Sequence, residues 1–201
     1  VFEAEKIIPF NVERHTISYS ITDGPSMEGT EVMIAAIDEP IIDQWLSIVK
    51  DIKAEPRQID VSCLSISHTA MVELPVEQTP ACFAIFLISH NCTDVTIVMD
   101  GKIVSARSIP RIGIRSLLET IPGDTGFEAW LQKNIHSVYI SMEDTKQPID
   151  MWFRKLSTQF QRTIEFAQRD YKVPPVNDLV IAGEGAALPG FSELIADKLN
   201  K

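Results

Sequence analysis

The sequence lacks the features that mark secreted, membrane-spanning or nucleic-acid-binding proteins. Its three cysteines, Cys63, Cys82 and Cys92, form no C-x-x-C pair, so neither a disulfide framework nor a zinc site is expected, and a reducing, cytoplasmic setting is favoured. No apolar run approaches the roughly 18 residues of a transmembrane helix. The net charge of −10 disfavours nucleic acid as a partner and argues against a polybasic membrane anchor.

Motifs of common hydrolases are also absent. The sequence contains no G-x-S-x-G nucleophile motif, and its four histidines are scattered without metal-ligand spacing. His90 lies in a turn without a neighbouring cysteine or aspartate partner, which is typical of a solvated loop residue. We therefore predict no catalytic residue and no metal ligand from these groups.

The patterns that are present predict an α/β fold. Of the 201 residues, 45% are hydrophobic and 23% charged, which is ordinary for a globular protein. Strands alternate with helices, and this order favours a mixed sheet with helices on both faces. Strands are expected at 16–22, 31–37, 58–62, 82–89, 93–99, 102–108 and 178–182, and helices at 1–8, 38–53, 64–73, 112–119, 127–134, 148–171 and 191–199.

Two turns are candidates for a binding site. Gly183-Glu184-Gly185-Ala186 lies between an apolar strand and a helix, where it either approaches a ligand or makes a tight turn; spacing alone leaves both open. The second is the polar run at 89–94, which follows the apolar strand 82–89. Asp94, within a strand of alternating residues, is expected to face solvent.

Several blocks, in this order, resemble one family. They are FEAEKIIPF at 2–10, the strand–helix–strand unit at 31–61, FLISHNCTDVTIVMDGKIVSARSIP at 86–110, FQRTIEFAQ at 160–168 and DLVIAGEGAALPGFSELIADKL at 178–199. Together they are similar to the PilM family, the actin-like cytoplasmic component of type IV pilus machines. The resemblance covers most of the chain except about 111–147.

This resemblance implies an actin-like (ribonuclease-H-like) α/β fold, with mixed sheets flanked by helices. The first residue is Val1, so we expect the native protein to begin upstream and the N-terminal part of the first lobe to be missing. The subdomains implied are 1–29 as part of an inserted 1C-like subdomain, 30–80 as the remainder of the first lobe (1A-like), and 81–201 as the second lobe (2A/2B-like).

The chain departs from the family where the chemistry lies. Leu87 stands at the position of the usual aspartate of the phosphate hairpin, Ser89 at that of a glycine, and Glu184 replaces a glycine of the adenosine turn. Leucine cannot hold Mg²⁺. Hydrolysis is therefore not expected, and the cofactor is either none or ATP with Mg²⁺. If nucleotide binding is retained, the resemblance implies binding by Ser89, Asn91, Thr93, Gly183, Glu184, Gly185 and Ala186.

The function implied is a cytoplasmic scaffold, peripheral to the inner membrane, in a type IV pilus or type II secretion assembly platform. Its implied partner is the N-terminal tail of a PilN-like inner-membrane protein, docked on a surface to which 1–22 and 31–53 contribute; self-association is left open. The alternatives are a nucleotide-binding ATPase or switch of the actin/sugar-kinase superfamily, or an FtsA-like cell-division protein.

Overall fold

The computed structural model describes residues 14–21, 32–74, 80–119, 143–187, 192 and 195–197. The chain forms two compact units, Val1–Val61 and Ser62–Lys201. The boundary between them lies within the range 30–80 that the resemblance assigns to the first lobe, and the correspondence of these units to actin-like subdomains stays a prediction. No helix of the described ranges combines the length and apolarity needed to cross a membrane.

The first unit contains a two-stranded sheet followed directly by a helix. Strands β1 (His15–Ile21) and β2 (Val32–Asp38) pair antiparallel, with Ile21 opposite Val32. Helix α2 (Glu39–Asp51) starts with a proline in its first turn, where the missing N–H costs nothing. These three elements agree with the predicted strands and helix to within about two residues.

Helix α2 carries two apolar stripes and buries neither completely. Ile42, Leu46 and Val49 are half-buried. The other stripe, here called the outer stripe, consists of Ile41, Trp45, Ile48 and Ile52, and all four are exposed, with Trp45 at 62%. The sequence predicted these four on one stripe with Val49, and within the first unit the described residues leave the outer stripe uncovered.

The second unit is built on a four-stranded mixed sheet with the order β5-β4-β3-β6. Antiparallel strands β3 (Cys82–Ile88), β4 (Cys92–Met99) and β5 (Lys102–Pro110) follow one another in sequence, whereas β6 (Asp178–Gly183) joins parallel to β3. The Asp100-Gly101 turn has positive φ at both residues, which confirms the hairpin predicted from that dipeptide.

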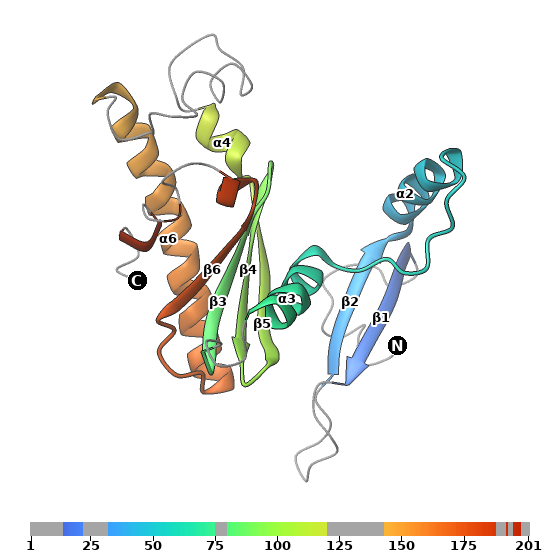
Figure 1. Ribbon diagram of the computed structural model, residues 1–201, viewed down its shortest axis with the longest axis horizontal. Coiled ribbons are helices and arrows are strands. Elements are labelled where there is room, and N and C mark those ends of the chain that lie inside the picture. The colour runs from blue at the N-terminus through green and yellow to red at the C-terminus, as the bar shows by residue number, and fades with distance from the viewer. Residues whose placement is uncertain are drawn as a thin grey trace. The chain divides into compact units, whose positions relative to one another are not determined.

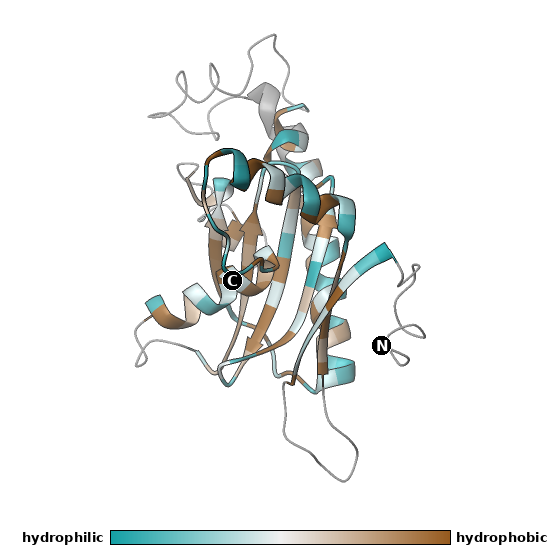
Figure 2. Cartoon of the chain, turned by 90° about the vertical axis from the view of Figure 1, so that its right-hand side faces the viewer, coloured by the Kyte–Doolittle hydropathy of each residue, from teal (hydrophilic) through white to brown (hydrophobic). Residues whose placement is uncertain are grey.

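Helices cover both faces of this sheet (Figure 1). Helix α3 (Ser62–Glu73) lies on one face, and the long helix α6 (Glu143–Tyr171) lies on the other, with the short α4 (Ile114–Leu118) beside it. The strands carry long hydrophobic stretches (Figure 2). The larger core, on the α6 side, includes Phe86, Ile88, Val95, Ile97, Trp152, Phe153, Leu156 and Phe160. The smaller core, under α3, comprises Ala70, Phe83, Ile85 and Val98.

Five of the predicted elements differ from the structure or lie wholly or mostly outside the described residues. The strand predicted at 58–62 does not form: residues 54–61 are irregular and Ser62 begins α3, and among the described residues no strand pairs with this segment. The long helix begins at Glu143 rather than at 148. The helices predicted at 1–8 and 127–134 lie outside the described residues, as does most of the one at 191–199.

Candidate functional site: two adjoining turns at one end of the sheet

The two turns singled out in the sequence meet because of the parallel pairing of β3 and β6. Ile88, the last residue of β3, lies opposite Gly183, the last residue of β6. After β6 the chain enters a short 3-10 helix, η3 (Glu184–Ala187). The turn at 89–91, called the β3–β4 turn, and the one at 183–187, called the β6–η3 turn, therefore leave the same end of the sheet. In open α/β sheets this carboxyl end of the strands is the usual place for ligands.

One side-chain contact joins the two turns. The imidazole Nδ1 of His90 lies 3.4 Å from the carboxylate Oε2 of Glu184, and both side chains are about half exposed. His90 was expected to be a solvated loop residue without a partner. The structure keeps it partly solvated but gives it a carboxylate neighbour from a distant part of the sequence.

The β3–β4 turn is fixed by backbone hydrogen bonds from the segment that follows β5. The Ser89 carbonyl accepts from the Ile114 N–H (3.0 Å), the His90 carbonyl from the Arg115 N–H (2.9 Å), and the Asn91 carbonyl from the Arg111 N–H (3.0 Å). The first two donors belong to the first turn of α4, so these helix N–H groups are satisfied by protein rather than by a ligand.

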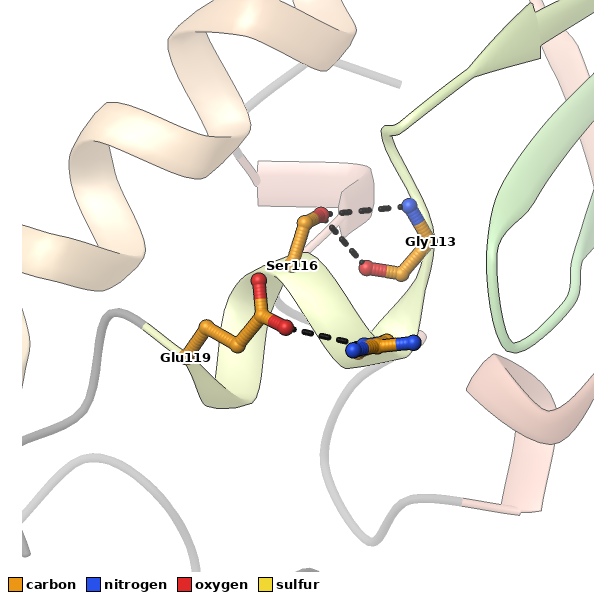
Figure 3. A network of polar contacts seen from close by, with 4 residues as sticks. Gly113, Ser116 and Glu119 are labelled. Atoms are coloured by element: carbon orange, nitrogen blue, oxygen red, sulfur yellow. Dashed lines mark hydrogen bonds and ion pairs between the residues drawn. The ribbon is translucent and has the colours of Figure 1, made fainter.

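Gly113, which precedes α4, allows this close approach. A Cβ built there would lie 2.5 Å from the His90 carbonyl oxygen and 2.6 Å from the Cys92 nitrogen. Its backbone is held in turn by Ser116, whose hydroxyl donates to the Gly113 carbonyl (2.8 Å) and accepts from the Gly113 N–H at 3.2 Å (Figure 3). The Trp152 Nε1–H of α6 donates to the same hydroxyl at 3.0 Å.

Thr93 and Asp94 both point into the protein. The Thr93 side chain is fully buried, and its hydroxyl donates to the Ile112 carbonyl. Asp94 is only 4% exposed, and its carboxylate accepts from the Ser62 hydroxyl at 2.7 Å. The prediction that Asp94 faces solvent is therefore wrong, because α3 covers that face of the strand. Ser62 is the first residue of α3, so the buried carboxylate also lies at the positive end of that helix.

The glycines of the β6–η3 turn are required by packing against β3. Gly183 has φ +79°, and a Cβ there would approach the Ile88 carbonyl oxygen to 2.7 Å. Gly185 is buried, and a Cβ there would meet the Ile88 side chain at 2.7 Å. Of the other predicted nucleotide-binding residues, Asn91, Glu184 and Ala186 are exposed and Ser89 is half-buried.

The end of β3 carries Leu87 rather than a carboxylate. Leu87 is half-buried and lies opposite Asp94 in the β3–β4 register. Its Cδ1 would be 3.0 Å from a Cβ placed on Gly183, so the side chain packs across the start of the β6–η3 turn. Within the described part of the chain, no three His, Cys, Asp or Glu residues are grouped as a metal site would require.

The two cysteines next to the strand ends are poorly activated. Burial raises the pKa of the Cys92 thiol, and the nearby Asp94 carboxylate raises it further, while a hydrogen bond with Ser108 opposes them. Burial likewise raises the pKa of Cys82, with additional contributions from Asp100 and Asp178. A raised pKa lowers the fraction of reactive thiolate at neutral pH, so the environment of these two cysteines does not activate them as nucleophiles.

The sheet order, the helices on both faces and the paired turns at one sheet end define an actin-like α/β protein. Solved structures agree. A chain of a PilM–PilN type IV pilus biogenesis complex is similar with a TM-score of 0.76 and 20% identity, over 99% of this chain and 58% of that one. MreB 5 of Spiroplasma citri bound to AMPPNP gives a TM-score of 0.58 and 16% identity, over 82% and 59%.

The family model described as type IV pilus assembly protein PilM matches residues 1–201. The chain therefore belongs to the PilM family, as the sequence blocks indicated. It spans 58% of the length of the PilM–PilN complex chain that it matches. A comparison with curated protein sequences gave no match.

Sequence reasoning found both turns but missed what supports them. The bracing segment 111–115 and the contact from Trp152 fall in or next to the region 111–147 that the resemblance did not cover. The only local signal was Gly113-Ile114-Arg115-Ser116, a glycine followed three residues later by a hydroxyl residue at a predicted helix start.

Proposed function

We propose that the chain is part of a cytoplasmic actin-like scaffold of a type IV pilus or type II secretion assembly platform, in which nucleotide hydrolysis is weak or lost. Membership of the PilM family provides the pilus context. The observation that carries the loss of hydrolysis is the His90–Glu184 contact, which keeps a carboxylate beside the turn that would approach phosphate.

The residues at the two turns fit a magnesium–nucleotide poorly. Leu87 offers no metal ligand at the end of β3, and a second carboxylate there would face the buried Asp94. The Thr93 hydroxyl is already used by the Ile112 carbonyl. The missing metal ligand at Leu87 and the occupied Thr93 hydroxyl leave fewer groups free to bind a magnesium–nucleotide, and both weigh against the nucleotide-switch alternative.

The test is a titration of a fluorescent ATP analogue with Mg²⁺ into the longest native form of the protein, with this chain as a control. We expect no saturable binding up to millimolar nucleotide. Micromolar affinity would overturn the proposal and revive the ATPase or switch alternative.

We further propose that the outer stripe of α2 contributes to docking of the N-terminal tail of a PilN-like inner-membrane protein, which would hold the scaffold at the membrane. A stripe of Ile41, Trp45, Ile48 and Ile52 exposed to water is costly unless a partner covers it. An exposed tryptophan flanked by aliphatic side chains is a common anchor of a peptide interface.

This docking is tested with a synthetic peptide of the PilN-like N-terminal tail. Saturable binding should be lost or weakened at least tenfold by Trp45→Ala, since such anchors contribute about 2 kcal/mol or more. Phe166→Ala is the matched control, because Phe166 is an exposed aromatic (43%) of the other unit. Equal binding by wild type and Trp45→Ala would remove α2 from the docking surface without affecting the nucleotide argument.

A further inference from the structure

A continuous series of hydrogen bonds connects the long helix α6 to the β3–β4 turn. It starts at the Trp152 indole N–H, passes through the Ser116 hydroxyl to the backbone of Gly113, and continues from the adjoining N–H groups of α4 to the turn. Its last two bonds join Ile114 to the Ser89 carbonyl and Arg115 to the His90 carbonyl.

The Ser116 hydroxyl is the centre of this series. A serine hydroxyl has one donor and two acceptor positions, and all three are used: it donates to the Gly113 carbonyl and accepts from the Gly113 and Trp152 N–H groups. Trp152 is 3% exposed and packs edge-on against Phe153, with ring centroids 5.2 Å apart. The start of the series is therefore fixed in the core.

At Gly113 the other end of this series, where α4 meets the β3–β4 turn, is also rigid. Because a Cβ at this position would lie within 2.7 Å of three backbone atoms of residues 90–92, the two backbones are in direct contact. A movement of Gly113 therefore cannot be absorbed between α4 and the turn. Packed contacts of this kind transmit small shifts rather than damping them.

We propose that α4 is a coupling element that ties the β3–β4 turn to α6, with Ser116 and Trp152 as positioning residues and Gly113 as the point of contact. The turn is thereby held in its conformation by α6 without a bound ligand. A partner that displaced α6 near Trp152 would displace the turn and its contact with Glu184. The coupling is independent of the proposed scaffold function.

The test is native-state amide hydrogen exchange, followed by NMR in the full chain. Trp152→Phe removes the indole donor but keeps an aromatic ring in the core. We expect the amides of Ile114, Arg115 and Arg111 to exchange about fivefold faster, the effect of weakening one hydrogen bond. None of these amides bonds to Trp152 directly, so a purely local role of the indole would leave them unchanged.

Ser116→Ala should produce the same selective acceleration, and Ser67→Ala is its matched control. Ser67 is fully buried whereas Ser116 is half-buried, and the Ser67 hydroxyl likewise donates to a backbone carbonyl, that of Cys63 within α3, away from the series. The coupling is refuted if Trp152→Phe leaves the three amides unchanged, if it accelerates core amides such as that of Phe86 by the same factor, or if Ser67→Ala has the same selective effect.

Discussion

The Nδ1 of His90 and the Oε2 of Glu184 lie 3.4 Å apart and connect the turn after β3 with the turn after β6. Both side chains are about half exposed, so the contact contributes less than about 1 kcal/mol to stability. Its consequence is chemical, because it keeps a carboxylate beside the turn that, in a nucleotide-binding relative, would approach phosphate.

Removing this carboxylate should reduce the repulsion of anions. For Glu184→Gln we expect the slope of the unsaturated titration with the fluorescent ATP analogue to rise roughly threefold to tenfold, since one charge at about 4 Å is worth about 1 kcal/mol in water. Glu119→Gln is the control, because Glu119 is also an exposed glutamate but pairs with Arg115 on α4. Identical titration curves for all three proteins would show that Glu184 does not limit nucleotide binding.

Placing an aspartate at position 87 of β3, where the resemblance to the PilM family predicts one, should destabilise the protein. Leu87→Asp would place a half-buried carboxylate directly opposite Asp94, and like charges opposed across strands repel. Including the lost burial of leucine, we expect a decrease of about 1–3 kcal/mol in the free energy of unfolding, measured by urea denaturation. Leu87→Asn, which adds no charge, should cost less; equal losses would rule out the charge as the cause.

The buried Ser62–Asp94 hydrogen bond should anchor α3 to the sheet. Asp94→Ala leaves the Ser62 hydroxyl without this partner and is expected to lower the free energy of unfolding by about 1–3 kcal/mol. Asp94→Asn keeps an acceptor oxygen and should cost clearly less. A double-mutant cycle compares Ser62→Ala, Asp94→Ala and the variant with both substitutions. If the loss of unfolding free energy in the double variant equals the sum of the two single losses, the two side chains do not interact energetically.

The reactivity of Cys92 should report the charge of Asp94. Because the carboxylate raises the pKa of the Cys92 thiol, Asp94→Asn should lower that pKa and increase thiolate at pH 8. We expect faster alkylation of Cys92 by iodoacetamide, followed by mass spectrometry of its peptide. Cys82 is an internal control, since Asp94 is not among the groups that raise its pKa. Faster alkylation of both cysteines would instead indicate that the substitution opens the fold generally.

The sequence predicted the strands of the second unit because their signals are local. Residues 82–88 form a continuous apolar run, and Asp100-Gly101 is a dipeptide that adopts the positive φ angles of a hairpin turn. The glycines at 183 and 185 also predicted a turn from local sequence alone, although their role in packing against Ile88 became clear only from the structure.

Asp94 shows where local patterns fail. Alternation predicts a solvent face only when one face of the sheet is open, whereas β4 lies between α3 and α6 and is buried from Thr93 to Val98. The failed strand prediction at 58–62 has a similar origin, because a short extended segment becomes a strand only if another strand is placed to pair with it.

The amino-acid sequence by itself determined the family and the order of most of the elements, since these depend on residue identity and local periodicity, while the replacements at Leu87, Ser89 and Glu184 stay predictions from the resemblance. Only the tertiary structure decided that His90 meets Glu184, that Asp94 is buried with Ser62, and that the β3–β4 turn is braced from α6 through Ser116. These contacts join residues far apart in the chain, and their geometry follows from parallel strand pairing and from which helix covers which face.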